Sequence, residues 1–157
     1  MKQVMDRRAA DNKYLHRDFH VSTDVGVSYV GELYGDNGVR EFLTVFATRY
    51  YSPLVEKTKT IGLKALEDHI LHIYEVEEAS DAVVTELTEN ELRVKIAYCP
   101  GVKFMKAKGR TPSQWYIELT RTVNMVIADN AGLGFELISY DEDTGAAEYR
   151  FFRRSFL

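Results

Sequence analysis

The single cysteine, Cys99, is the residue of this chain with the most direct route to covalent chemistry. It is expected to end a strand, and the stretch from Lys103 to Lys108 after Pro100 is expected to open a short helix. A thiol beside a helix N-terminus and near a lysine has its thiolate favoured, and a thiolate is a nucleophile. The alternative is a buried filler, because free cysteine is among the most buried residue types.

Two pairs of histidines offer a base or metal ligands. His16 and His20 lie four residues apart with Asp18 between them, and an aspartate beside a histidine can orient its ring as a general base. We predict that His20 is this base, Asp18 its orienting group, and His16 a substrate contact; the alternative is a solvated N-terminal arm. His69 and His72 are three apart, but no further ligands follow at a known spacing, so no metal is predicted.

Arg121 and Asn124 lie three residues apart on a predicted helix. An arginine among apolar neighbours suits a small carboxylate, which it binds through two parallel hydrogen bonds. We therefore predict that both residues contact substrate, with pairing of the arginine to an acidic side chain as the alternative. A basic stretch over 103–110 is accompanied by no RNA-binding motif, so no nucleic-acid partner is expected.

Helices are expected in the first half of the chain and hairpins in the second. Helices are predicted over about 24–34, over 36–50 with Val39, Phe42, Leu43, Phe46 and Tyr50 on its buried face, and over 52–74 with Gly62 as a weak point. Period-two alternation predicts one hairpin from 83–87 and 92–98, and another from 135–140 and 146–154. Between the hairpins, Thr111-Pro112-Ser113-Gln114 has the form of a capping box that opens a helix ending near Gly132.

These elements predict an α+β domain, in which N-terminal helices precede a hairpin–helix–hairpin unit that forms an antiparallel sheet of about four strands packed against helices. A chain of 157 residues is expected to be one domain, with residues 1–12 as a flexible arm. Forty-five per cent hydrophobic and 28 % charged residues exclude a disordered protein. A net charge of -4 argues against a nucleic-acid coat. No secretory signal or membrane span is evident, so a reducing cytoplasm is expected.

Several common catalytic motifs are absent from the sequence. It contains no phosphate-binding glycine loop, no GxSxG nucleophile elbow and no HExxH zinc motif. Nucleotide, dinucleotide and serine-hydrolase chemistry therefore lose support, and no cofactor is predicted. The residues alone indicate an α+β domain with a small-molecule pocket.

The order of segments resembles the L-2-amino-thiazoline-4-carboxylic acid hydrolase family over roughly residues 12–154. The resemblance is carried by Tyr14-Leu15-His16-Arg17-Asp18-Phe19-His20, the helix start from Tyr34-Gly35 to Phe42-Leu43, Tyr50-Tyr51-Ser52-Pro53-Leu54, Cys99-Pro100 and Arg121-Thr122-Val123-Asn124. It implies ring opening of a 2-aminothiazoline carboxylate to a carbamoyl-cysteine product.

The roles of individual residues are assigned from what this ring-opening reaction requires and from their positions in the sequence. Cys99 would attack the amidine-like C2 carbon, or His20 would activate water while Asp18 orients it. Arg121 would hold the carboxylate, and Asn124 would hydrogen-bond the ring or the tetrahedral intermediate.

Two alternatives belong to other functional classes. One is a non-catalytic small-molecule-binding or sensor domain, whose layout resembles the vinyl-reductase-type ligand-binding domains. The other is a structural homodimer whose exposed aromatic residues form the interface. The character of the pocket discriminates between a hydrolase and a small-molecule-binding domain. A catalyst should bring Cys99 or His20 near a buried cation, whereas a binder shows an apolar cavity without a positioned base.

Overall fold

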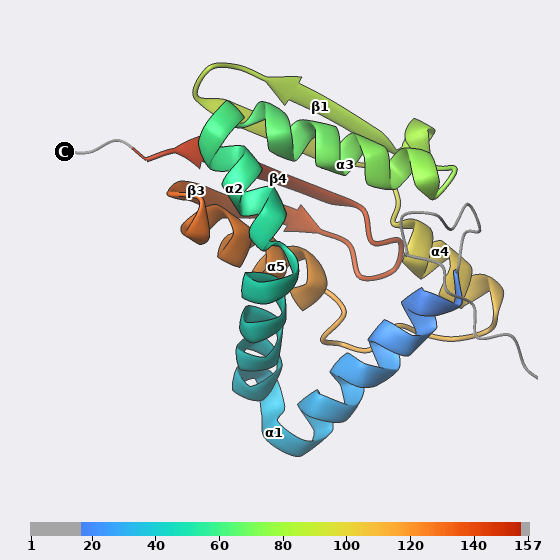
Figure 1. Cartoon of the computed structure of the whole chain (residues 1–157). Coiled ribbons are helices and arrows are strands. Elements are labelled where there is room, and N and C mark those ends of the chain that lie inside the picture. The colour runs from blue at the N-terminus through green and yellow to red at the C-terminus, as the bar shows by residue number, and fades with distance from the viewer. Residues whose placement is uncertain (1–16, 155–157) are drawn as a thin grey trace, which may run out of the picture.

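The computed structural model describes residues 17–154, and the proposed arm over 1–12 lies outside this range. A long kinked helix and two shorter helices precede the first hairpin. Two further helices and a second hairpin follow it (Figure 1). The elements are α1 (Asp18–Tyr50), α2 (Ser52–Ile61), α3 (Lys64–Val76), the short η2 (Ser80–Ala82), β1 (Val83–Leu87), β2 (Glu91–Ile96), α4 (Pro100–Ala107), α5 (Glu118–Asn130), β3 (Leu133–Tyr140) and β4 (Ala147–Arg153).

The strands form one antiparallel sheet in the order β1-β2-β4-β3. Both predicted hairpins are confirmed, and the second strand of each hairpin lies in the centre of the sheet, where Val94 of β2 faces Tyr149 of β4. Helices α2 and α3 lie across one face of this sheet (Figure 1). The predicted α+β class is therefore confirmed.

The two faces of the sheet differ in chemistry, as the alternating pattern predicts. The face toward the helices buries Leu92, Val94 and Phe151. On the opposite face, Arg150 pairs with Glu91 at 3.0 Å, and Glu91 is also 3.2 Å from Arg93. One face therefore forms the core and the other carries a solvated network of ion pairs.

Helix α1 consists of two arms that meet at Gly35, which adopts a positive φ of 68° (Figure 1). The arms match the two helices expected from sequence, although the first begins earlier, at Asp18. A second glycine, Gly62 with φ 77°, separates α2 from α3, where one helix was expected. L-residues rarely adopt this left-handed conformation, so both glycines act as helix breakers.

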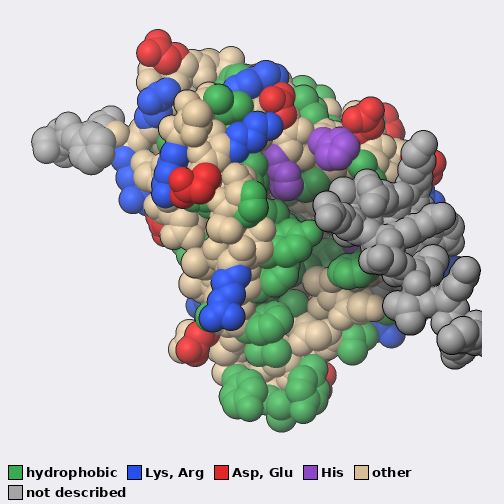
Figure 2. All heavy atoms as spheres, viewed as in Figure 1, with side chains coloured by type: hydrophobic (Ala, Val, Ile, Leu, Met, Phe, Trp, Pro, Cys, Tyr) green, Lys and Arg blue, Asp and Glu red, His purple; other side chains and the backbone are tan. Residues whose placement is uncertain are grey.

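The buried face of the second α1 arm is narrower than predicted, because Val39 and Leu43 are buried as expected but the three aromatic residues are not. Val39, Leu43 and Ala47 form the buried stripe, whereas Phe42, Phe46 and Tyr50 are 46 %, 40 % and 67 % exposed. Only the narrow stripe that repeats every four residues is covered, so the aromatic side chains beside it remain in solvent. Figure 2 shows hydrophobic side chains gathered around the kink of α1 on this face. These aromatics are the surface on which the homodimer alternative depends.

The helix expected from Pro112 begins later, because α5 starts at Glu118 and residues 114–117 form turns. The Ser113 N–H donates to Asp24 Oδ1 of α1 at 2.8 Å instead of completing a capping box. Trp115 donates its indole N–H to Asp36 at 2.8 Å. These bonds fix the segment before α5 inside the bend of α1.

Within residues 17–154, no helix is both long and apolar enough to cross a membrane.

Candidate functional site

A pocket of about 220 Å³ lies between α3 and α5, above the central strands of the sheet. Its walls combine aliphatic and aromatic side chains with a few polar groups. Cys99 and Asn124, two of the predicted site residues, both line it. The remaining lining residues are Tyr51, His69, Ile70, Ile73, Tyr74, Ile96, Leu119, Thr120, Val123, Ile127, Gly145, Ala147 and Tyr149.

Cys99 occupies the N-cap position of α4, in the connection between the end of β2 and Pro100. Its backbone N–H donates to the Thr144 carbonyl at 2.9 Å, which ties it to the loop between β3 and β4. Gly145 of that loop has φ 67°, and a Cβ there would collide with the Cβ of Cys99. The predicted placement between a strand and a short helix is thus confirmed, and the second hairpin holds it.

The acidity of Cys99 differs from the sequence prediction. Burial is the largest influence and raises the pKa of the thiol above its ordinary value. The N–H groups of Gly101 and Val102 and the hydroxyl of Tyr116 act in the opposite direction, but they do not overcome burial. The N-terminus of α4 thus favours the thiolate as expected, but burial outweighs this effect, so the expectation of an activated thiolate is wrong and the thiol is protonated at neutral pH.

Because the pKa of Cys99 is raised, we expect iodoacetamide to alkylate the folded protein at neutral pH at least about tenfold more slowly than the unfolded chain. The rate should still be rising with pH where the thiol of the unfolded chain has already ionised. Mass spectrometry of samples quenched over a range of pH gives both rates. A folded-state rate that levels off below pH 8 would contradict the raised pKa.

His20 is held by a carboxylate that the sequence did not suggest. Its Nε2 lies 2.9 Å from Glu77 Oε1, at the end of α3, and 57 residues separate the two in sequence. A carboxylate can only accept this bond, so the geometry assigns a proton to Nε2. The side chain of Asp18, predicted for this role, lies outside the described side chains, as does the whole of His16.

His20 and Cys99 both lie beside the first turn of α4. A Cβ on Gly101, in the first turn of α4, would lie 2.7 Å from His20 Nδ1 and would also collide with the hydroxyl of Tyr116. That hydroxyl hydrogen-bonds the thiol of Cys99. The thiol, the phenol and a carboxylate-held imidazole thus all lie beside the first turn of α4.

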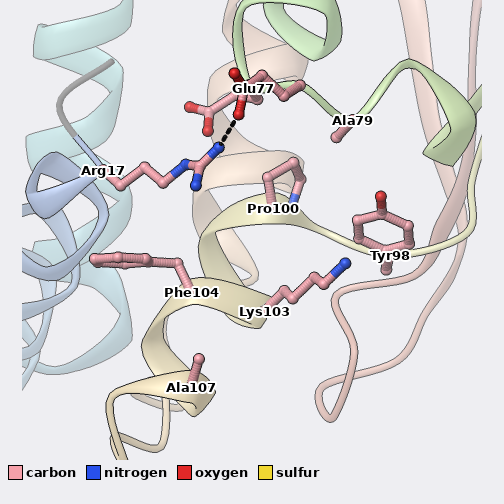
Figure 3. A pocket seen from close by; sticks show the side chains of 9 residues that line it. Arg17, Glu77, Ala79, Tyr98, Pro100, Lys103, Phe104 and Ala107 are labelled. Carbon is pink, nitrogen blue, oxygen red and sulfur yellow. Dashed lines mark hydrogen bonds and ion pairs between the residues drawn. The ribbon is translucent and has the colours of Figure 1, made fainter. Parts of the chain in front are cut away.

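A second hollow, of about 240 Å³, is lined by Pro100, Glu77 and Lys103 among other residues (Figure 3). Glu77 lines it, and its Oε2 is buried without a hydrogen-bond partner among the described residues. Arg17 pairs with the neighbouring Glu78 at 2.6 Å, and Lys103 lies 4.5 Å from the centre of the Tyr98 ring. The cations of this hollow are therefore already engaged.

Arg121 does not line the pocket, although Asn124 on the same helix does. Its guanidinium forms a short ion pair with Glu118, which also accepts a hydrogen bond from Thr122 at 2.6 Å. The amide of Asn124 donates to the Thr120 carbonyl at 2.8 Å. To hold a carboxylate in the pocket, as predicted, Arg121 would have to leave Glu118. The alternative of an arginine paired to an acidic side chain is the arrangement observed.

Glu118 should make the protein sensitive to acid. Burial raises its pKa, but hydrogen bonds from Arg121 and Thr122 and the charge of Arg40 outweigh burial, so the net pKa is lowered. A depressed carboxyl pKa stabilises the fold above the unfolded value of about 4.3, and this contribution is lost as the pH falls through the folded pKa. We expect Glu118→Gln to remove about 1 kcal/mol of this pH-dependent stability, because both arginines are partly solvated.

Urea unfolding from pH 7 down to pH 2 measures this effect, with the exposed Glu86→Gln as the matched control. Equal pH dependence in the two variants would contradict the assigned role of Glu118.

The sequence prediction missed most of the polar groups that face the pocket. His69 was considered as a metal ligand, yet it lies edge-on to Tyr51 with ring centres 5.8 Å apart. Burial is the main cause that lowers its pKa, aided by His72 and Lys57. His69 therefore presents a neutral imidazole to the pocket. Within residues 17–154, no group of three metal-ligating side chains is present.

Comparisons with known proteins add no family assignment. The sequence matches no protein-family model, and no curated protein matches it. The likeness to the thiazoline hydrolase family therefore stays a prediction, and functional interpretation depends on the geometry of the pocket.

Proposed function

We propose that the chain is a small-molecule-binding domain whose ligand occupies the pocket between α3 and α5. The observation that carries the proposal is the lining of this pocket, where apolar walls surround the thiol of Cys99, the amide of Asn124 and the imidazole of His69. Ligand sites commonly combine apolar walls with a few placed polar groups. Since Cys99 is a free thiol, the proposed setting is a reducing cytoplasm.

The size of the pocket limits the ligand. Its 220 Å³ is below the range of about 300–1,000 Å³ that holds drug-sized molecules, so a single substituted ring is the expected scale. The ring of a thiazoline or thiazolidinone falls on this scale. We therefore use a thiazolidinone carboxamide as the first probe.

Filling the pocket tests the proposal. Ala147 is 7 % exposed and lines the pocket, so Ala147→Leu should reduce the space and weaken carboxamide binding about tenfold or more. Ala97→Leu is the matched control, because Ala97 is exposed and lies outside the pocket lining. Calorimetric titration of the two variants and the parent chain gives the affinities. Equal affinity in all three would reject the pocket as the binding site.

Hydrolysis of a 2-aminothiazoline-4-carboxylate-like molecule is the second candidate function. It is favoured by one observation, the meeting of Cys99, Tyr116 and the Glu77-held His20 at the first turn of α4. In the net reaction, water adds at C2, the ring carbon–sulfur bond breaks, and the released sulfur takes up a proton. Because the thiol is protonated at rest, His20 would be needed as the general base.

The product of ring opening carries a free thiol, so a thiol-reactive dye added to samples filtered free of protein follows turnover. We expect Cys99→Ala and His20→Gln each to lower the rate at least about a hundredfold, the usual contribution of a positioned acid–base group. Full activity in both variants would reject this mechanism while leaving binding intact.

A further inference from the structure

We infer that the pocket at Cys99 accepts an uncharged ligand, such as a carboxamide, and disfavours the corresponding carboxylate or amine. This inference rests on the proposed binding function and specifies its ligand class. The geometry behind it is the character of the lining. Among residues 17–154, none that lines the pocket is an Asp, Glu, Lys or Arg.

The polar groups that face the pocket are suited to neutral hydrogen bonding. They comprise an amide, the Thr120 hydroxyl, an imidazole, a thiol and the phenols of three tyrosines. Such groups can donate to a carbonyl or accept from an N–H. A buried charge without a counter-ion is strongly destabilised, whereas a neutral polar group needs only hydrogen-bond partners.

The titratable side chains that line the pocket are themselves held in their uncharged forms. Burial is the largest cause in each case: it raises the pKa of Cys99, Tyr51, Tyr74 and Tyr149, and it lowers the pKa of His69. Each shift favours the uncharged form of its group at neutral pH. The environment that keeps these side chains neutral would impose the same desolvation cost on a charged ligand.

Two charged side chains that flank the pocket lining are paired with neighbouring residues. Arg121 binds Glu118, and Glu77 binds His20. Glu77 raises the pKa of Cys99 and Tyr74 from one end, whereas Lys57 and His72 lower that of His69 from the other. Because these charges act in opposite directions, neither an anionic nor a cationic ligand has a counter-ion dedicated to it.

Three thiazolidinones that differ in one substituent test the inference: the carboxamide, the carboxylate and the aminomethyl compound. Calorimetric titration at pH 7 should show the carboxamide binding at least about tenfold more tightly than either charged compound. Equal or tighter binding of a charged compound would overturn the neutral-ligand inference and leave the proposed binding function standing. Binding of none of the three would overturn both.

A charge placed in the lining provides a second test. Ile73 lines the pocket and is 40 % exposed, so Ile73→Lys should fold while adding one cation. We expect this variant to shift the preference toward the carboxylate by about tenfold. Ile61→Lys, at a 50 % exposed position outside the pocket lining, is the matched control and should leave the preference unchanged. An unchanged preference in Ile73→Lys would contradict a ligand bound in this pocket.

Discussion

Replacing Phe151 by alanine is expected to lower the free energy of unfolding by about 3–5 kcal/mol. Phe151 is 1 % exposed at the centre of the sheet. Its ring centre lies 5.2 Å from that of Phe135 and 6.0 Å from that of Tyr149, so truncation leaves a cavity among aromatic neighbours. The sheet face that forms the floor of the pocket would lose its support.

The neighbouring Phe152→Ala is the control for this prediction. Phe152 lies on the opposite face, is partly exposed, and has the Arg150 guanidinium 5.0 Å from its ring centre. We expect its loss to cost less than about 2 kcal/mol, since little buried surface is removed. Chemical unfolding of both variants measures the difference. Equal losses would contradict the assignment of the two faces.

Replacing Gly145 by alanine is expected to destabilise the fold by about 2–5 kcal/mol. Its φ of 67° is a left-handed conformation that costs an L-residue about 1–2 kcal/mol. The added Cβ would also collide with Cys99 Cβ and approach Val102 Cγ2 to 3.0 Å, and overpacking of this kind costs about 1–3 kcal/mol. The loop between β3 and β4 would then move away from the first turn of α4.

Gly109→Ala separates the two contributions. Gly109 has a similar φ of 74°, but a Cβ there would meet nothing within 4 Å, so only the conformational cost of about 1–2 kcal/mol is expected. Urea unfolding of the two alanine variants gives the steric contribution by difference. If both lose the same stability, Gly145 does not pack against Cys99 as the structure shows.

Local sequence patterns predicted the strands and most breaks in the helices. Alternation such as Leu92, Val94 and Ile96 set both the hairpin and its buried face, because side chains on a strand alternate between two environments. Gly35 and Gly62 interrupt helices where the sequence placed a boundary or a weak point. These features depend on residues close in the chain.

The buried face of α1 was predicted less well, for a physical reason. Val39 and Phe42 lie on adjacent parts of an apolar surface that is wider than the area a single neighbouring helix can cover. Which part is buried depends on where α5 packs, and helix pattern alone does not contain that information.

For the site, the sequence correctly placed Cys99 between a strand and a helix, but it misjudged the acidity of the thiol. Burial by segments distant in sequence, including the loop around Gly145, determines that acidity. The partnership of His20 with Glu77 spans 57 residues and leaves no local signal. Arg121 was predicted to contact ligand because its pairing with Glu118, which also accepts a hydrogen bond from Thr122, was one of several helical arrangements that the sequence allows.

The most direct test of the central claim, that a small molecule binds against Cys99, is a methyl NMR titration with the thiazolidinone carboxamide. Four of the seven isoleucines, Ile70, Ile73, Ile96 and Ile127, line the pocket, whereas Ile61, Ile117 and Ile138 do not. The account predicts saturable shifts of the four pocket methyl signals with little change in the other three. Shifts confined to the outside isoleucines, or none at all, would contradict it.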